Sequence, residues 1–147
     1  MANEEELGKI EAELQMQQAR GEAIRQQIQG MQNSSLEIAT AIEALQNVRK
    51  VKGDTLVPIG AGVFFSCPKP DFDRVVMNIG AGVMVQKKPD EALGALMERQ
   101  KKIADAMKSA QEDMSQVISA IDGLTRRASA MGAEEERNVR PAKEQAR

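Results

Sequence analysis

The sequence predicts an α+β protein in which a long antiparallel coiled-coil helical hairpin carries two inserted β-hairpins, which contribute to an oligomeric β-barrel. Three observations predict this fold. Heptad patterns occupy both sides of the chain, a glycine-containing phrase is repeated in the middle, and aromatic residues make up only 2% of the 147 residues. So few aromatic side chains, beside 29% charged residues, suit long helices better than a compact globular core.

The first predicted element is a coiled-coil helix within residues 1–53. Its apolar residues recur at alternating spacings of three and four, the pattern of a coiled-coil seam. Gln17 and Gly21 interrupt this seam, and Gly53 is expected to end the helix. The seam positions are Leu7, Ile10, Leu14, Gln17, Gly21, Ile24, Ile28, Met31, Ser35, Ile38, Ile42 and Leu45.

Residues 54–88 are predicted to form two β-hairpins in tandem. The phrase Ile-Gly-Ala-Gly-Val occurs at 59–63 and again at 79–83, with apolar strand-forming residues on both sides. Glycine permits the positive φ of a tight β-turn, whereas a dinucleotide-binding loop would need a third glycine and a following helix. Residues 67–71 contain two prolines and are expected to join the two hairpins.

These hairpins are expected to need partners, because an isolated β-hairpin is only marginally stable and leaves open edges. We expect the flanking helices to pair with each other rather than cover the hairpins, so hairpins of several chains should join into one sheet or barrel. The chain is therefore predicted to be an obligate oligomer. The predicted assembly positions are Val57, Ile59, Val63, Phe65, Val75, Met77, Ile79, Val83 and Val85.

A second coiled-coil helix is predicted for residues 89–131, beginning at Pro89 with acidic residues in its first turn. Short connections make it antiparallel to the first helix, with Gly21 opposite Val117. Val117 is therefore expected to be poorly covered. Residues 132–147 mix both charge signs and are expected to form a disordered tail. The seam positions are Leu93, Leu96, Gln100, Ile103, Met107, Ala110, Met114, Val117, Ile121, Leu124, Ala128 and Met131.

Composition argues against several classes of function. Histidine is absent and Cys67 is the single cysteine, so a zinc site or histidine-based catalysis is not expected. Without a phosphate loop or a paired base and nucleophile, neither an enzyme nor a cofactor is expected. The formal net charge of -2 gives no general attraction to nucleic acid or to an anionic membrane. One cysteine and an acidic N-terminus unlike a signal peptide favour a cytoplasmic protein.

The layout resembles the alpha-class subunits of archaeal-type prefoldin. The resemblance covers residues 7–131 and depends most on Leu-Val-Pro-Ile-Gly-Ala-Gly at 56–62 and Asn-Ile-Gly-Ala-Gly-Val at 78–83. It implies a heterohexamer of two alpha and four beta subunits, and an ATP-independent chaperone that delivers non-native polypeptides to a group II chaperonin. The client-binding residues that it implies are Leu7, Ile10, Leu14, Met16, Ile121, Leu124, Ala128 and Met131.

Two other functions stay open at this stage. One is a structural coiled-coil scaffold that oligomerises through its β-hairpins and binds no client. The other is a helical nucleic-acid arm, which would require clustered basic residues that the glutamate-rich N-terminal segment does not supply. For Leu7, Ile10, Leu124 and Met131, seam packing and client contact are equally compatible with the sequence.

Overall fold

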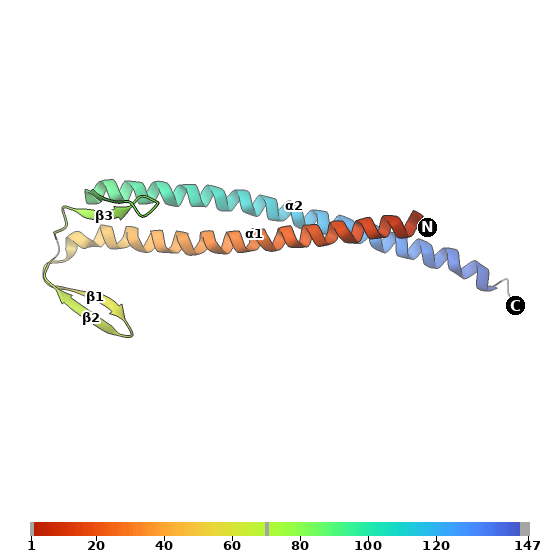
Figure 1. Ribbon diagram of the computed structural model, residues 1–147, viewed down its shortest axis with the longest axis horizontal. Helices are drawn as coiled ribbons and strands as arrows, with labels where there is room; N and C mark the ends of the chain where they lie inside the picture. Colours follow the sequence, from red (N-terminus) through yellow and green to blue (C-terminus); the bar gives the residue numbers. More distant parts are fainter. Residues whose placement is uncertain (1, 70, 145–147) are drawn as a thin grey trace. The chain divides into compact units, whose positions relative to one another are not determined.

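The computed structural model describes residues 2–69 and 71–144, with side chains described for 4–69 and 71–138. The chain forms two long helices, α1 (Ala2–Asn47) and α2 (Pro89–Glu144), and the segment between them in sequence contains four strands (Figure 1). The chain divides into two compact units. Unit 1 consists of Met1–Gly30 and Met107–Arg147, and unit 2 consists of Met31–Ala106.

The predicted helix seams are confirmed in both units. All twelve seam positions on each helix are buried or half-buried, whereas most of the residues between them are exposed. In unit 1, Arg127 Nη2 lies 2.6 Å from Glu6 Oε1, and Gly21 lies against Val117. From the first contact to the second, the residue number rises along α1 and falls along α2, so the two helices of unit 1 are antiparallel.

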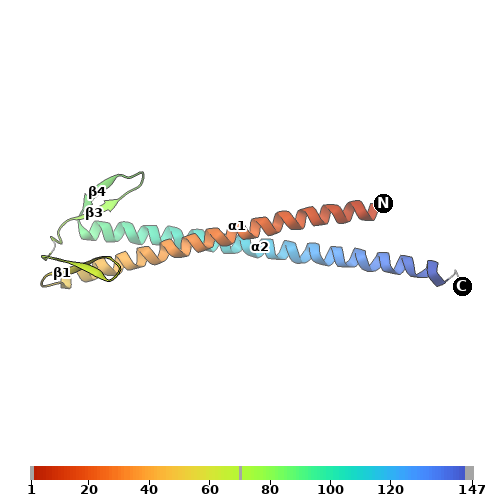
Figure 2. The same cartoon turned by 60° about the horizontal axis from the view of Figure 1, so that its bottom comes forward.

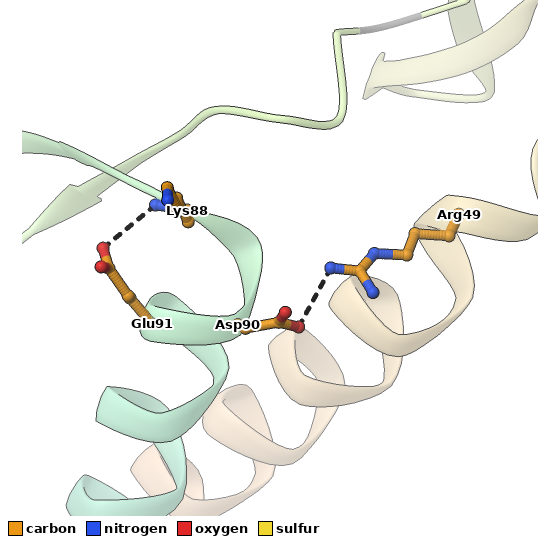
Figure 3. A network of polar contacts seen from close by, with 4 residues as sticks. All are labelled: Arg49, Lys88, Asp90 and Glu91. Carbon is orange, nitrogen blue, oxygen red and sulfur yellow. Dashed lines mark hydrogen bonds and ion pairs between the residues drawn. The ribbon is translucent and has the colours of Figure 1, made fainter.

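Helix α1 ends before the predicted Gly53, at Asn47, and a 3-10 turn, Val48–Lys50, follows it. Arg49 of this turn contacts the beginning of α2, where its Nη2 lies 3.0 Å from Asp90 Oδ1 (Figure 3). Both side chains are more than half exposed, so this ion pair contributes little to stability. It nevertheless shows that the end of α1 and the start of α2 lie together in unit 2.

The predicted start of α2 is confirmed at Pro89, with Asp90 and Glu91 in the first turn. The Lys88 backbone N–H donates a hydrogen bond to Glu91 Oε2 at 3.3 Å (Figure 3). This is the reciprocal half of a capping box, in which a glutamate three residues into the helix satisfies the N–H of the capping residue.

The expected disordered tail differs from the structure, because α2 continues without a break to Glu144. Residues 133–137 are one alanine, three glutamates and one arginine, and several of these residue types favour helix. Gly132 costs about 1 kcal/mol relative to alanine, which is too little to end a helix that continues on both sides. Residues 145–147 of the predicted tail lie outside the described residues.

The two predicted hairpins are confirmed as two separate two-stranded antiparallel sheets. Hairpin 1 consists of β1 (Thr55–Gly60) and β2 (Val63–Cys67). Hairpin 2 consists of β3 (Val75–Asn78) and β4 (Met84–Lys87), and Figure 2 shows its two strands apart from β1. A barrel requires further strands and stays a prediction about an assembly.

Both hairpin turns depend on positive φ angles, as the glycines predict. In hairpin 1 the φ angles of Gly60 and Gly62 are 117° and 77°, and Ala61 between them adopts 50°. The second turn repeats this backbone, with Ala81 at 49°. Alanine is therefore held in the left-handed region twice, which costs roughly 1–2 kcal/mol at each position.

Candidate assembly and client-binding site

The apolar side chains of hairpin 1 are exposed on both faces of its sheet. Val57 pairs with Phe65 across the strands, so these two residues share one face, and Phe65 is 62% exposed. Phe64 pairs with Pro58 on the opposite face and is also exposed. A two-sided apolar surface of this kind normally marks a site of protein–protein contact.

Hairpin 2 has one covered face. Met77 is only 9% exposed, and Val85, which is paired with it, is half-buried. A hollow of about 290 Å³ lies beside this face, lined by residues of β3 and of both helices, including Leu45 and Leu96. The expectation that the helices leave the hairpins uncovered is therefore wrong for hairpin 2, because the helix ends of unit 2 offer it an apolar surface.

The predicted assembly residues thus fall into two groups. Those of hairpin 1, together with Ile79 and Val83 at the second turn, are exposed, and Val75, Met77 and Val85 are not. Further exposed apolar residues lie on the other faces of the two hairpins, outside the nine predicted assembly positions. Pairs of consecutive apolar residues mark them in the sequence, because strands that are apolar on both faces lose strict alternation. These further residues are Leu56, Phe64, Val76 and Met84.

The predicted client-binding residues lie at the start of α1 and the far part of α2, both in unit 1. We call residues 7–16 and 121–131 the distal seam. Ile10 and Leu124 are buried at its centre, whereas the Met16 side chain is 62% exposed and lies outside the helix–helix contact. The half-buried members are Leu7, Leu14, Ile121, Ala128 and Met131.

The sequence suggested that Gly21 leaves its partner on α2 poorly covered, and the structure shows that this expectation is wrong. Val117 opposite it is the most buried residue of the described chain, at 1% exposure. A Cβ atom at position 21 would lie 3.3 Å from Val117 Cγ1. The helices therefore approach closely here because glycine has no side chain. Gln17 is a real weak point, since its Oε1 is buried without a hydrogen-bond partner among the described residues.

The surface beside the distal seam is rich in carboxylates. A hollow of about 410 Å³ is lined by Glu5, Glu6, Glu13, Lys9, Ile10 and Arg127. Three carboxylates against two cations repel phosphate groups, so this surface does not favour the nucleic-acid arm. Among the described side chains of residues 4–69 and 71–138, no group of His, Cys, Asp and Glu could hold a metal ion. No helix in the described part of the chain could span a membrane.

This geometry defines a helical-hairpin protein with tandem β-hairpins whose apolar surfaces are largely uncovered. The family model described as "Prefoldin subunit" matches residues 4–134. The chain therefore belongs to the prefoldin family, which is a chaperone family.

The relatives of the chain include several prefoldin alpha subunits. It is 31% identical over 129 residues to prefoldin subunit alpha of Pyrococcus horikoshii, covering 86% of this chain and 87% of the relative. It is 29% identical to prefoldin subunit alpha of Methanococcoides burtonii, in an alignment that covers 78% of this chain and 85% of the relative. A chain in the cryo-EM structure of filamentous PFD from Methanocaldococcus jannaschii has the same fold, with a TM-score of 0.67 at 17% identity. The superposition covers 77% of this chain and 95% of that chain.

Proposed function

We propose that this chain is a subunit of an ATP-independent chaperone that captures unfolded polypeptides at the distal seam and delivers them to a group II chaperonin. In this proposal it assembles through its hairpins with a second alpha subunit and four beta subunits. It acts in the cytoplasm and has no enzymatic activity of its own. The chain is a member of the prefoldin family, and one observation carries the proposal. Its distal seam is apolar, and α1 and α2 cover these apolar side chains only in part.

The exposure pattern supports client binding physically. Two helices can bury only a narrow stripe of each other, so Leu7 and Met131 keep part of their apolar surface in water. Met16 adds an exposed, flexible thioether side chain beside the helix–helix contact, and methionine accommodates many different partner shapes. Several such weak sites on one assembly would bind an extended polypeptide with useful avidity.

An aggregation assay tests this proposal. The complete assembly is mixed with a chemically denatured protein, and aggregation of that protein is followed by light scattering with and without the assembly. The variants Leu7→Ser, Met131→Ser and Met16→Ser are combined, since none of these side chains is fully buried. We expect the combined variant to assemble normally and to suppress aggregation less. Leu36→Ser is the matched control, because Leu36 is 70% exposed on α1 but lies in unit 2.

The result separates the two remaining functions. If the assembly suppresses aggregation but the combined variant is as active as the control, clients bind elsewhere and the distal-seam assignment is wrong. If the wild-type assembly forms and never suppresses aggregation, the coiled-coil scaffold is the better description. Delivery is tested separately, by transfer of a labelled client from the assembly to a purified group II chaperonin.

A further inference from the structure

Hairpin 2 is attached to α2 by a polar contact in addition to the burial of Met77. Arg99 Nη2 donates a hydrogen bond to the backbone carbonyl oxygen of Asn78 at 2.8 Å. Both residues belong to unit 2, so this contact lies within one compact part of the chain. Hydrogen bonds from a charged donor are shorter and stronger than those between neutral groups.

The carbonyl that Arg99 binds lies on the open edge of β3. The N–H of Ile79 donates across the hairpin to the carbonyl oxygen of Val83 at 3.0 Å. Backbone polar groups of successive residues in an antiparallel strand point to opposite sides, so the carbonyl of Asn78 points away from β4. An unpaired edge carbonyl is a point where another strand can add, and Arg99 occupies it.

Hairpin 1 lacks the equivalent attachment. Pro58 occupies the position of Asn78 in the repeated phrase. Within residues 4–69 and 71–138, no side chain donates a hydrogen bond to a backbone carbonyl of β1 or β2. The two hairpins therefore differ both in the burial of one face and in the occupation of one edge carbonyl by a side chain.

We propose that Arg99 is a positioning residue that holds hairpin 2 on the helix pair before any partner subunit binds. The docked hairpin presents its other face, with Val76 and Met84, its β4 edge, and Ile79 and Val83 at the turn. A partner therefore meets hairpin 2 in one orientation and cannot add a strand along the end of β3 that Arg99 closes. Hairpin 1 remains the element that adjusts to its partner. The consequence for assembly rests on the proposed function, whereas the docking itself does not.

Methionine oxidation measures the docking directly. Met77 and Met84 are on opposite faces of hairpin 2, at 9% and 58% exposure, so Met84 is an internal reference for Met77. The full chain is treated with dilute hydrogen peroxide, and sulfoxide formation at each methionine is located by fragment-ion mass spectrometry. In the wild type, Met77 should oxidise much more slowly than Met84. Arg99→Leu removes the donor, keeps part of the aliphatic stem and introduces no new sulfur.

We expect Arg99→Leu to raise the oxidation rate of Met77 roughly threefold, because the lost hydrogen bond has a charged donor but is exposed. Arg99→Lys keeps a charged donor and should restore most of the protection. Arg126→Leu is the matched control, because Arg126 is also an exposed arginine of α2 and pairs with Asp122 on the same helix. It should leave Met77 unchanged.

Two results would overturn the proposal. One is a Met77 that oxidises as fast as Met84 in the wild type, since the hairpin would then not be docked. The other is a Met77 in Arg99→Leu that stays as protected as in the wild type. Because neither client nor partner is present, a failure here is distinct from a failure of the aggregation assay.

Discussion

Hairpin 1 and hairpin 2 contain the same five-residue phrase, and their turns have nearly the same backbone. The φ angles of Gly60 and Gly80 are 117° and 119°, and those of Ala61 and Ala81 are 50° and 49°. Their surroundings differ. Val57 in hairpin 1 is exposed, whereas its counterpart Met77 in hairpin 2 is buried.

The lengths of the connections explain this difference. Only Lys88 separates β4 from α2, so hairpin 2 is held beside the first turns of that helix. Hairpin 1 is separated from the preceding 3-10 turn by residues 51–54 and from hairpin 2 by residues 68–74. A longer connection allows more arrangements and costs more entropy to fix in one of them. Equal phrases can therefore serve as one docked and one free element.

The largest expected effect is on assembly through hairpin 1. Phe64→Ser combined with Phe65→Ser removes an aromatic ring from each face. Burying each ring would contribute about 1.5–3 kcal/mol, so subunit affinity should fall roughly a hundredfold or more. Native mass spectrometry with a prefoldin beta subunit measures the loss. Leu36→Ser should assemble normally, and normal assembly of the double variant would show that hairpin 1 is not the assembly surface.

The next effect separates the two faces of hairpin 2. Met77→Ser removes the one buried side chain of the hairpin and should weaken docking by about 1–3 kcal/mol. Amide hydrogen exchange in β3 and β4 should then accelerate at least several-fold, with exchange in hairpin 1 unchanged. Met84→Ser changes an exposed methionine of the same hairpin and should leave exchange as it is. Equal exchange in both variants would remove the distinction between the faces.

A smaller effect tests the likeness of the turns. Ala61→Gly and Ala81→Gly each relieve a left-handed alanine, and the gain is reduced by the greater freedom of glycine in the unfolded chain. We expect a net stabilisation of up to about 1 kcal/mol in each hairpin. The rate of amide hydrogen exchange next to each turn should fall by the factor that corresponds to this gain in free energy. A response in one hairpin alone would mean that the surroundings, and not the turn, control its strain.

The smallest effect concerns a bond that hairpin 2 alone can make. Asn78 Oδ1 accepts a hydrogen bond from the Gly80 N–H at 2.9 Å, and Pro58 in hairpin 1 has no side-chain acceptor. Asn78→Ala should cost about 0.5 kcal/mol, since the bond is exposed. The Gly80 amide should exchange about twofold faster. Pro58→Asn is the reciprocal test, in which the Gly60 amide is expected to exchange more slowly.

Much of the fold could be predicted because the helices and turns depend on local patterns. Heptad spacing specifies which side of each helix is apolar, and every predicted seam position is buried or half-buried. Burial of Val117 opposite Gly21 could not be predicted, because it depends on how closely two helices approach. The docking of Met77 was missed for the same reason, since no pattern within β3 records the apolar surface that the helix ends provide.

By itself, the sequence determined the two helices, the antiparallel seam, the tandem hairpins and their left-handed turns, because each depends on periodicity or on backbone freedom at a few neighbouring residues. The tertiary structure alone decided that hairpin 2 docks while hairpin 1 stays free, and that Arg99 meets the edge of β3. These contacts join residues far apart in the chain, and their existence depends on connection lengths and surface shape that no local pattern encodes.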